Sequence, residues 1–182
     1  MRQWAEAALG RRQVARALRR LVLDGFEIRD VLVDGDSAQH NDRLLVGPQG
    51  MFVVGFRTLP GNVWRPGRTD PAGAALVLHA RATRQLAALV QINLQPELTR
   101  HRIAVMPLLT VIGPEQPPGH LVGGLPLLGP AGLLDHLTAG PHVLTPMQIA
   151  SLTDRVDDWL SLRSVNNLRT RGVRQNGRPG SL

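Results

Sequence analysis

Two apolar runs, at residues 51–54 and 103–112, constrain the fold of this chain more than any other feature of its sequence. Both are short, and both are apolar at nearly every position rather than at alternate ones. Successive side chains of a strand point to opposite faces, so a strand that is apolar throughout is expected to be covered on both faces. The two runs therefore predict central strands of a sheet that lies between layers of helices.

The segments around these runs supply the remaining elements. Residues 4–23 have the periodicity of an amphipathic helix, and residues 74–94 predict a second, largely apolar helix that ends before Pro96. The other expected elements are strands at 26–33, 43–46, 51–57 and 63–64, a strand-like piece at 121–128, and helices at 131–138 and from Thr145-Pro146 to about residue 162. The order predicts an α/β domain with an α-β-β-β-α-β core, in which helices flank a small mixed sheet and a helical C-terminal extension follows.

Length and composition favour one folded unit. The chain has 182 residues, of which 43% are hydrophobic, and this suits a single core. We expect one domain at residues 1–163 and a flexible basic tail at residues 164–182, where the apolar pattern stops. The N-terminus does not lead into an apolar stretch of signal-peptide length, so a soluble, cytoplasmic protein is expected.

The basic residues are all arginine. The sequence contains no lysine and no cysteine, so lysine amine chemistry, disulfides and thiolate metal sites are excluded. The formal net charge of +7 makes nucleic acid or another anionic surface a reasonable partner, although a solvated basic surface has the same composition.

A hairpin segment carries a resemblance to a known family. Residues 40–57 read HNDRLLVGPQGMFVVGFR, and residues 10–15, GRRQVA, begin the amphipathic part of the first helix. These two segments, together with Pro60-Gly61-Asn62-Val63 and the later runs at 102–113 and 122–128, resemble the nuclease-related (NERD) domain, in particular its actinobacterial members. The family is similar to the PD-(D/E)XK nucleases, so the resemblance implies a restriction-endonuclease-like fold.

The resemblance also implies a metal-dependent chemistry. Such enzymes hold Mg²⁺ with two or three carboxylates, and a lysine on the same strand helps to orient or activate the attacking water. In this chain the glutamate position of the first helix falls on Arg11, and the first strand aspartate is kept as Asp42. The following histidine is Arg43, the second acid is Gly55 and the lysine is Arg57. No catalytic set is intact, which predicts a pseudoenzyme for which no cofactor is expected.

Asp42 has two readings. It is a vestigial metal ligand, or it is a carboxylate that now pairs with Arg43, Arg57 or Arg11, and we favour the ion pair. A working Mg²⁺-dependent nuclease would need relocated ligands, for which Glu6, Asp34 and Asp36 are the candidates.

The function expected from the resemblance is binding of DNA, RNA or a partner protein through an arginine-lined former active-site cleft. The alternatives are the relocated-ligand nuclease and a structural or regulatory module without affinity for nucleic acid. The histidines other than His40 show no ligand spacing and are expected at the surface or at helix caps: His79, His101, His120, His136 and His142. The candidate nucleic-acid-binding residues are Arg11, Arg12, Arg16, Arg19, Arg20, Arg43 and Arg57.

Overall fold

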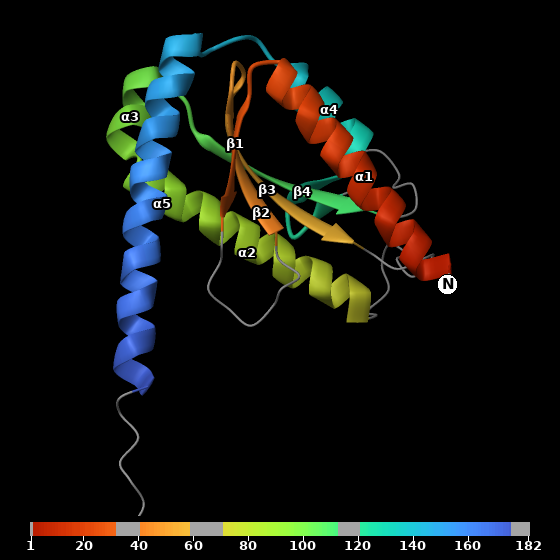
Figure 1. Cartoon of the computed structure of the whole chain (residues 1–182). Helices are drawn as coiled ribbons and strands as arrows, with labels where there is room; N and C mark the ends of the chain where they lie inside the picture. Colours follow the sequence, from red (N-terminus) through yellow and green to blue (C-terminus); the bar gives the residue numbers. More distant parts are fainter. Residues whose placement is uncertain (1, 32–40, 59–70, 113–120, 176–182) are drawn as a thin grey trace, which may run out of the picture.

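A mixed six-stranded sheet forms the centre of the molecule and has helices on both faces (Figure 1). The computed structural model describes residues 2–31, 41–58, 71–112 and 121–175. The helices are α1 (Arg2–Leu23), α2 (Pro71–Asn93), α3 (Gln95–His101), α4 (Pro130–Thr138) and α5 (Pro146–Gln175). The strands are β1 (Glu27–Val31), β2 (Asn41–Gly47), β3 (Gly50–Thr58), β4 (Val105–Ile112), β5 (Leu121–Val122) and β6 (Leu125–Leu128), in the spatial order β1-β2-β3-β4-β6-β5.

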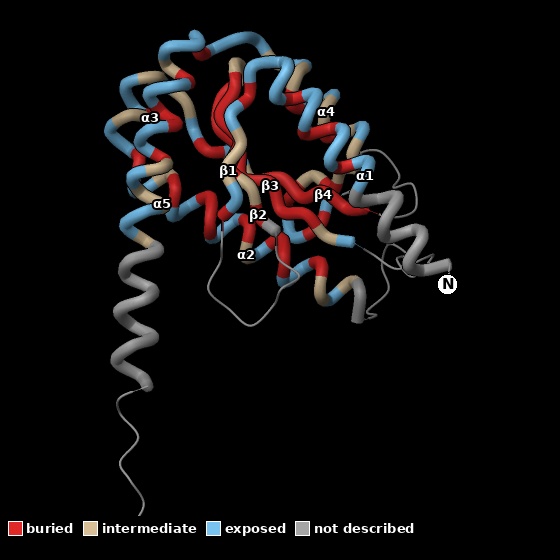
Figure 2. Tube along the Cα trace, in the orientation of Figure 1, coloured by how far each residue is buried: buried red, intermediate tan, exposed pale blue. Residues whose placement is uncertain are grey.

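The strand directions confirm the α/β class. The pairs β1–β2, β2–β3 and β5–β6 are antiparallel, whereas β3–β4 and β4–β6 are parallel. A parallel pair needs a crossover, and α2 with α3 supplies the one between β3 and β4. The apolar run at 51–54 lies in β3 and most of the run at 103–112 lies in β4, and both strands are buried along most of their length (Figure 2).

Two hydrophobic clusters, one on each face, fix the layers. Met51 and Val53 of β3 face α2 and α5, whereas Phe52 and Val54 face α1 and α4. The predicted hairpin is confirmed: Gly47 pairs with Gly50 across the turn Pro48-Gln49.

Most helix boundaries lie within three residues of expectation, and two larger differences stand out. The helix from Pro146 continues to Gln175, so residues 164–175 of the expected tail are helical. The chain also forms α3 immediately after α2, where Pro96 was expected to mark only an end. Proline is tolerated in the first turn of a helix, because the N–H group that it lacks has no intrahelical partner there. The strand expected at residues 63–64 lies outside the described residues.

The start of α5 agrees with the prediction. Gln148 N–H donates to Thr145 Oγ1 at 3.4 Å, and Thr145 N–H donates to Gln148 Oε1 at 2.8 Å. This reciprocal pair is a capping box, with Pro146 at the first helical position.

Candidate functional site

Asp42, the candidate vestigial metal ligand of the sequence analysis, lies in a closed polar cluster under α2. Asp42 is on β2 opposite Gly55 of β3, and both face the helix. His79 and Thr83, one helical turn apart on α2, lie directly above the glycine. Asp42 is 1% exposed, and His79 and Thr83 are 0% exposed. The cluster is therefore sealed from solvent rather than set in an open cleft.

Gly55 is the residue that lets the helix approach so closely. A Cβ atom at this position would lie 2.7 Å from His79 Nε2 and 3.2 Å from Asp42 Oδ1, and Thr83 Oγ1 would be its nearest neighbour. Side chains of α2 therefore fill the space that a carboxylate at position 55 would need.

The electrostatics of Asp42 follow from its burial. His79 Nε2 lies 3.5 Å from Asp42 Oδ1, a contact that is an ion pair only when the imidazole is protonated. Neither carboxylate oxygen accepts a hydrogen bond from the part of the chain that the structure describes. Loss of hydration disfavours the charged form and raises the pKa of Asp42 from 3.8 to about 6.

The expected pairing of Asp42 with Arg43 is wrong. Adjacent residues of a strand point to opposite faces, so Arg43 lies on the α1 side of the sheet. There its Nε donates to Asp30 Oδ1 at 2.7 Å, and its guanidinium lies 5.6 Å from the ring centroid of Phe56. Within the described residues Arg57 forms no ion pair with Asp42, and the side chain of Arg11 lies outside them.

A catalytic metal site is not assembled by the described residues. They contain no group of three His, Cys, Asp or Glu side chains that could hold a metal ion. Asp42 and His79 supply two possible ligands, fewer than the three or more protein ligands usual for catalytic zinc and without the carboxylate set of the magnesium nucleases. The alternative ligands Asp34 and Asp36, and the side chain of Glu6, lie outside the described residues.

The expectation that all five histidines are surface or capping residues is wrong for His79. It occupies the buried face of α2, together with Leu76, Ala80 and Leu86. The burial of His79 could have been predicted from the sequence, because position 79 falls within the apolar stripe of α2 that faces the sheet. His136 and His142 are exposed, and His101 Nδ1 contacts Gln148 Nε2 at 3.1 Å. His120 lies outside the described residues.

The arginines of α1 divide into two groups. Arg12, Arg16 and Arg19 are exposed and have no carboxylate partner among the described residues. Arg20 forms an ion pair with Asp24 at 3.6 Å, which draws its side chain toward the C-terminal end of the helix. We call Arg12, Arg16 and Arg19 the arginine row.

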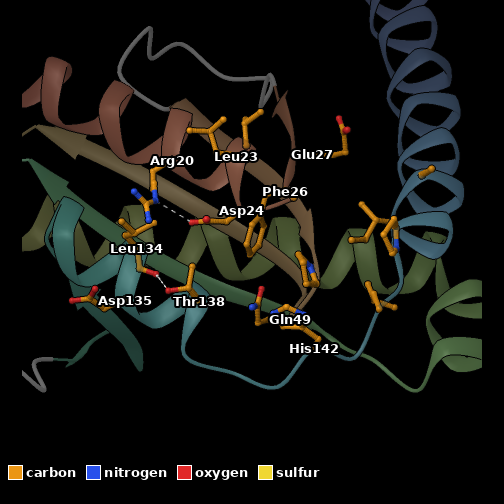
Figure 3. Close-up of a pocket in the computed structure, with 17 residues that line it drawn as sticks. Arg20, Leu23, Asp24, Phe26, Glu27, Gln49, Leu134, Asp135, Thr138 and His142 are labelled. Carbon is orange, nitrogen blue, oxygen red and sulfur yellow. Dashed lines mark hydrogen bonds and ion pairs between the residues drawn. The ribbon is translucent and has the colours of Figure 1, made fainter.

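An open pocket of about 1060 Å³ lies at the end of α1, between the β2–β3 turn, α4 and the start of α5 (Figure 3). Among the described residues, Arg20 is the only predicted binding residue that lines it. The carboxylates of Asp24, Glu27 and Asp135 also line it, so the charge of its described lining does not suit a phosphate. None of the residues of the Asp42 cluster reaches this pocket.

Comparisons with protein-family models, curated proteins and solved structures give no match to this chain. None of the helices that the structure describes is both long enough and apolar enough to cross a lipid bilayer.

Proposed function

We propose that this protein is a non-catalytic, nuclease-related domain that binds the phosphate backbone of nucleic acid through the arginine row of α1. The observation that carries the proposal is the absence of carboxylate partners for Arg12, Arg16 and Arg19 among the described residues. Exposed guanidinium groups without such partners are available to phosphate oxygens, which they bind in a bidentate manner.

The spacing of the row suits a nucleic-acid strand. The three arginines follow one another at intervals of four and three residues, so they lie along one side of the helix. From Arg12 to Arg19 the helix rises about 10 Å, at about 1.5 Å per residue. Phosphates of one DNA strand recur about every 3.4 Å along the helix axis, so the row spans about three of them.

The Asp42 cluster supports the non-catalytic part of the proposal. A carboxylate that is 1% exposed has no direct access to a phosphodiester, and its neighbours at Gly55 leave no room for a second acid. The binding surface is therefore assigned to α1 rather than to an arginine-lined cleft around Asp42. This differs from the surface that the family resemblance implies.

The test is a binding titration of labelled duplex DNA, single-stranded DNA and RNA, followed by fluorescence anisotropy. The variant Arg12→Gln/Arg16→Gln removes two charges from the row and is expected to weaken binding to every sequence alike. The matched control is Arg100→Gln/Arg102→Asn, which removes two exposed arginines at the end of α3, on the opposite side of the molecule from α1 (Figure 1). Asparagine is chosen for Arg102 because that residue has a φ of 55°.

The two rival functions give different results in the same experiment. A structural or regulatory module would bind none of the three probes even at low salt. A nuclease with relocated ligands would cleave them when Mg²⁺ or Mn²⁺ is added. Either result would overturn the proposal.

A further inference from the structure

The segments that wall the pocket at the end of α1 are fixed to one another. One wall is the turn between β2 and β3, where the Pro48 carbonyl accepts hydrogen bonds from Val143 N–H at 2.7 Å and Leu144 N–H at 3.0 Å. On the side of α1, Gly25 lies so near this turn that an added Cβ atom would be 3.6 Å from Pro48 Cγ. The pocket is therefore pre-formed, as is usual for a small-molecule site.

The described lining of this pocket is mainly apolar. Its apolar residues are Val22, Leu23, Phe26, Pro48, Leu134, Leu144, Pro146, Ile149 and Ala150. Val22 and Leu23 line the pocket and are nevertheless 56% and 82% exposed, so an apolar ligand there would remove nonpolar surface from water. The volume of about 1060 Å³ is close to the upper end of the range of about 300–1000 Å³ that is typical of small-molecule sites. The pocket can therefore take a ligand with an apolar chain.

The charged groups of the described lining are mostly acidic. Asp24, Glu27 and Asp135 supply carboxylates to the pocket (Figure 3), and Arg20 supplies a guanidinium. This guanidinium is already paired with Asp24, at 3.6 Å. Asp135 makes no ion pair within the described residues. The pocket is thus acidic although the whole chain has a formal net charge of +7, and its local field favours a cation.

Neutral polar groups of the lining add hydrogen-bond acceptors. Gln49 Oε1 is buried and receives no hydrogen bond from the described residues. The Thr138 hydroxyl donates to the Leu134 carbonyl at 2.9 Å, so its oxygen can only accept from a ligand. His142 also lines the pocket, and an unprotonated imidazole nitrogen accepts as well. A buried acceptor without a donor is unfavourable, and an ammonium group, which carries only donors, would supply one.

We infer that this pocket binds a small organic cation, namely an apolar chain that ends in a protonated amine. The apolar wall takes the chain, and the carboxylates and neutral acceptors of the lining hold the ammonium group. A carboxylate or phosphate ligand of the same shape is disfavoured by the acidic groups that already face the pocket. The inference is independent of the proposed function, because the arginine row of α1 does not line this pocket.

The first test compares two probes of equal chain length and opposite charge, octylammonium and octanoate. At about pH 8 the amine keeps its proton and the acid has lost its own. Nuclear magnetic resonance titration of the isotope-labelled full chain should show saturable shifts of the lining residues with octylammonium. Octanoate should bind at least about tenfold more weakly, because its charge repels the carboxylates. No saturable shift with octylammonium, or equal affinity for the two probes, overturns the inference.

The second test removes the unpaired carboxylate. Asp135→Asn should weaken octylammonium binding about two- to fivefold, which is the effect of one exposed ion pair. Asp154→Asn is the matched control, because Asp154 is exposed on α5 and does not line the pocket. Equal weakening by both variants would show that only the overall charge of the protein matters, and this result contradicts a site at Asp135.

The third test fills the pocket. Ala150 is exposed on α5 and lines the pocket, so Ala150→Phe should place a ring in it and abolish the binding of octylammonium. Ser151→Phe is the matched control, because Ser151 is the next residue of the helix, is exposed and does not line the pocket. Circular dichroism checks that both variants keep the fold. Binding that survives Ala150→Phe would place the ligand elsewhere and overturn the inference.

Discussion

Replacement of Asp42 by asparagine should stabilise the protein above neutral pH and have little effect in acid. Burial raises the pKa of the Asp42 carboxyl to about 6, so the folded protein holds this proton where the unfolded chain has released it. The contribution of this bound proton to the free energy of unfolding is fully present below pH 3.8, and it is lost as the pH rises through about 6. Asparagine has nearly the same shape and never carries the charge.

The size of the effect follows from the shift of the pKa. A rise from 3.8 to about 6 is about two units. At 1.36 kcal/mol per unit, the charged carboxylate costs the folded state about 3 kcal/mol above pH 7. Urea unfolding at a series of pH values gives the free energy of unfolding of both proteins. The difference between Asp42→Asn and wild type should grow from near zero at pH 4 to about 3 kcal/mol at pH 8.

Two results would refute this reasoning. A difference in the free energy of unfolding between Asp42→Asn and wild type that stays constant with pH would mean that Asp42 does not titrate between pH 4 and pH 8. A variant less stable than wild type at pH 8 would mean that the charged carboxylate is stabilised in the fold, as an ion pair with His79. Asp154→Asn is the control, because Asp154 is exposed on α5 and makes the same chemical change without burial.

Two further changes test the geometry of the fold. Gly55→Asp places an acid where the proposed nuclease-related pattern has one, but its Cβ would collide with Thr83 Oγ1 and His79 Nε2. We expect a lower melting temperature and no metal-dependent cleavage; a stable variant that cleaves DNA with Mn²⁺ would contradict the closed site. Thr145→Ala removes the hydroxyl that accepts from Gln148 N–H and should cost about 1 kcal/mol in urea unfolding. An unchanged unfolding midpoint would show that the capping box contributes nothing measurable.

The sequence predicted the layers of the fold because the strands carry a strong pattern. Strands β3 and β4 are apolar on both faces, and only a central place in a sheet between helices satisfies this. The helix α3 was missed because Pro96 was read as an end, although proline also suits a first turn. The extension of α5 to Gln175 was not predicted, because residues 164–175 lack the apolar periodicity of an amphipathic helix.

The candidate site was predicted in part. Asp42 was singled out as a candidate, and the structure places it beside His79 of α2 rather than beside the neighbouring Arg43. Strand alternation was sufficient to separate Arg43 from Asp42, since adjacent residues face opposite sides. The contact of His79 with Asp42 could not be predicted in the same way. It depends on how α2 packs against β3, which is set by contacts between segments far apart in the sequence.

The most direct test of the proposed function is the salt dependence of nucleic-acid binding. The logarithm of the affinity should fall linearly with the logarithm of the salt concentration between about 50 and 200 mM, with a slope of about −0.9 for each phosphate contact. The variant Arg12→Gln/Arg16→Gln should reduce the steepness of that slope by about 2, and Arg100→Gln/Arg102→Asn should leave it unchanged. Equal slopes for the α1 variant and wild type, or no binding at low salt, would contradict phosphate binding by the arginine row.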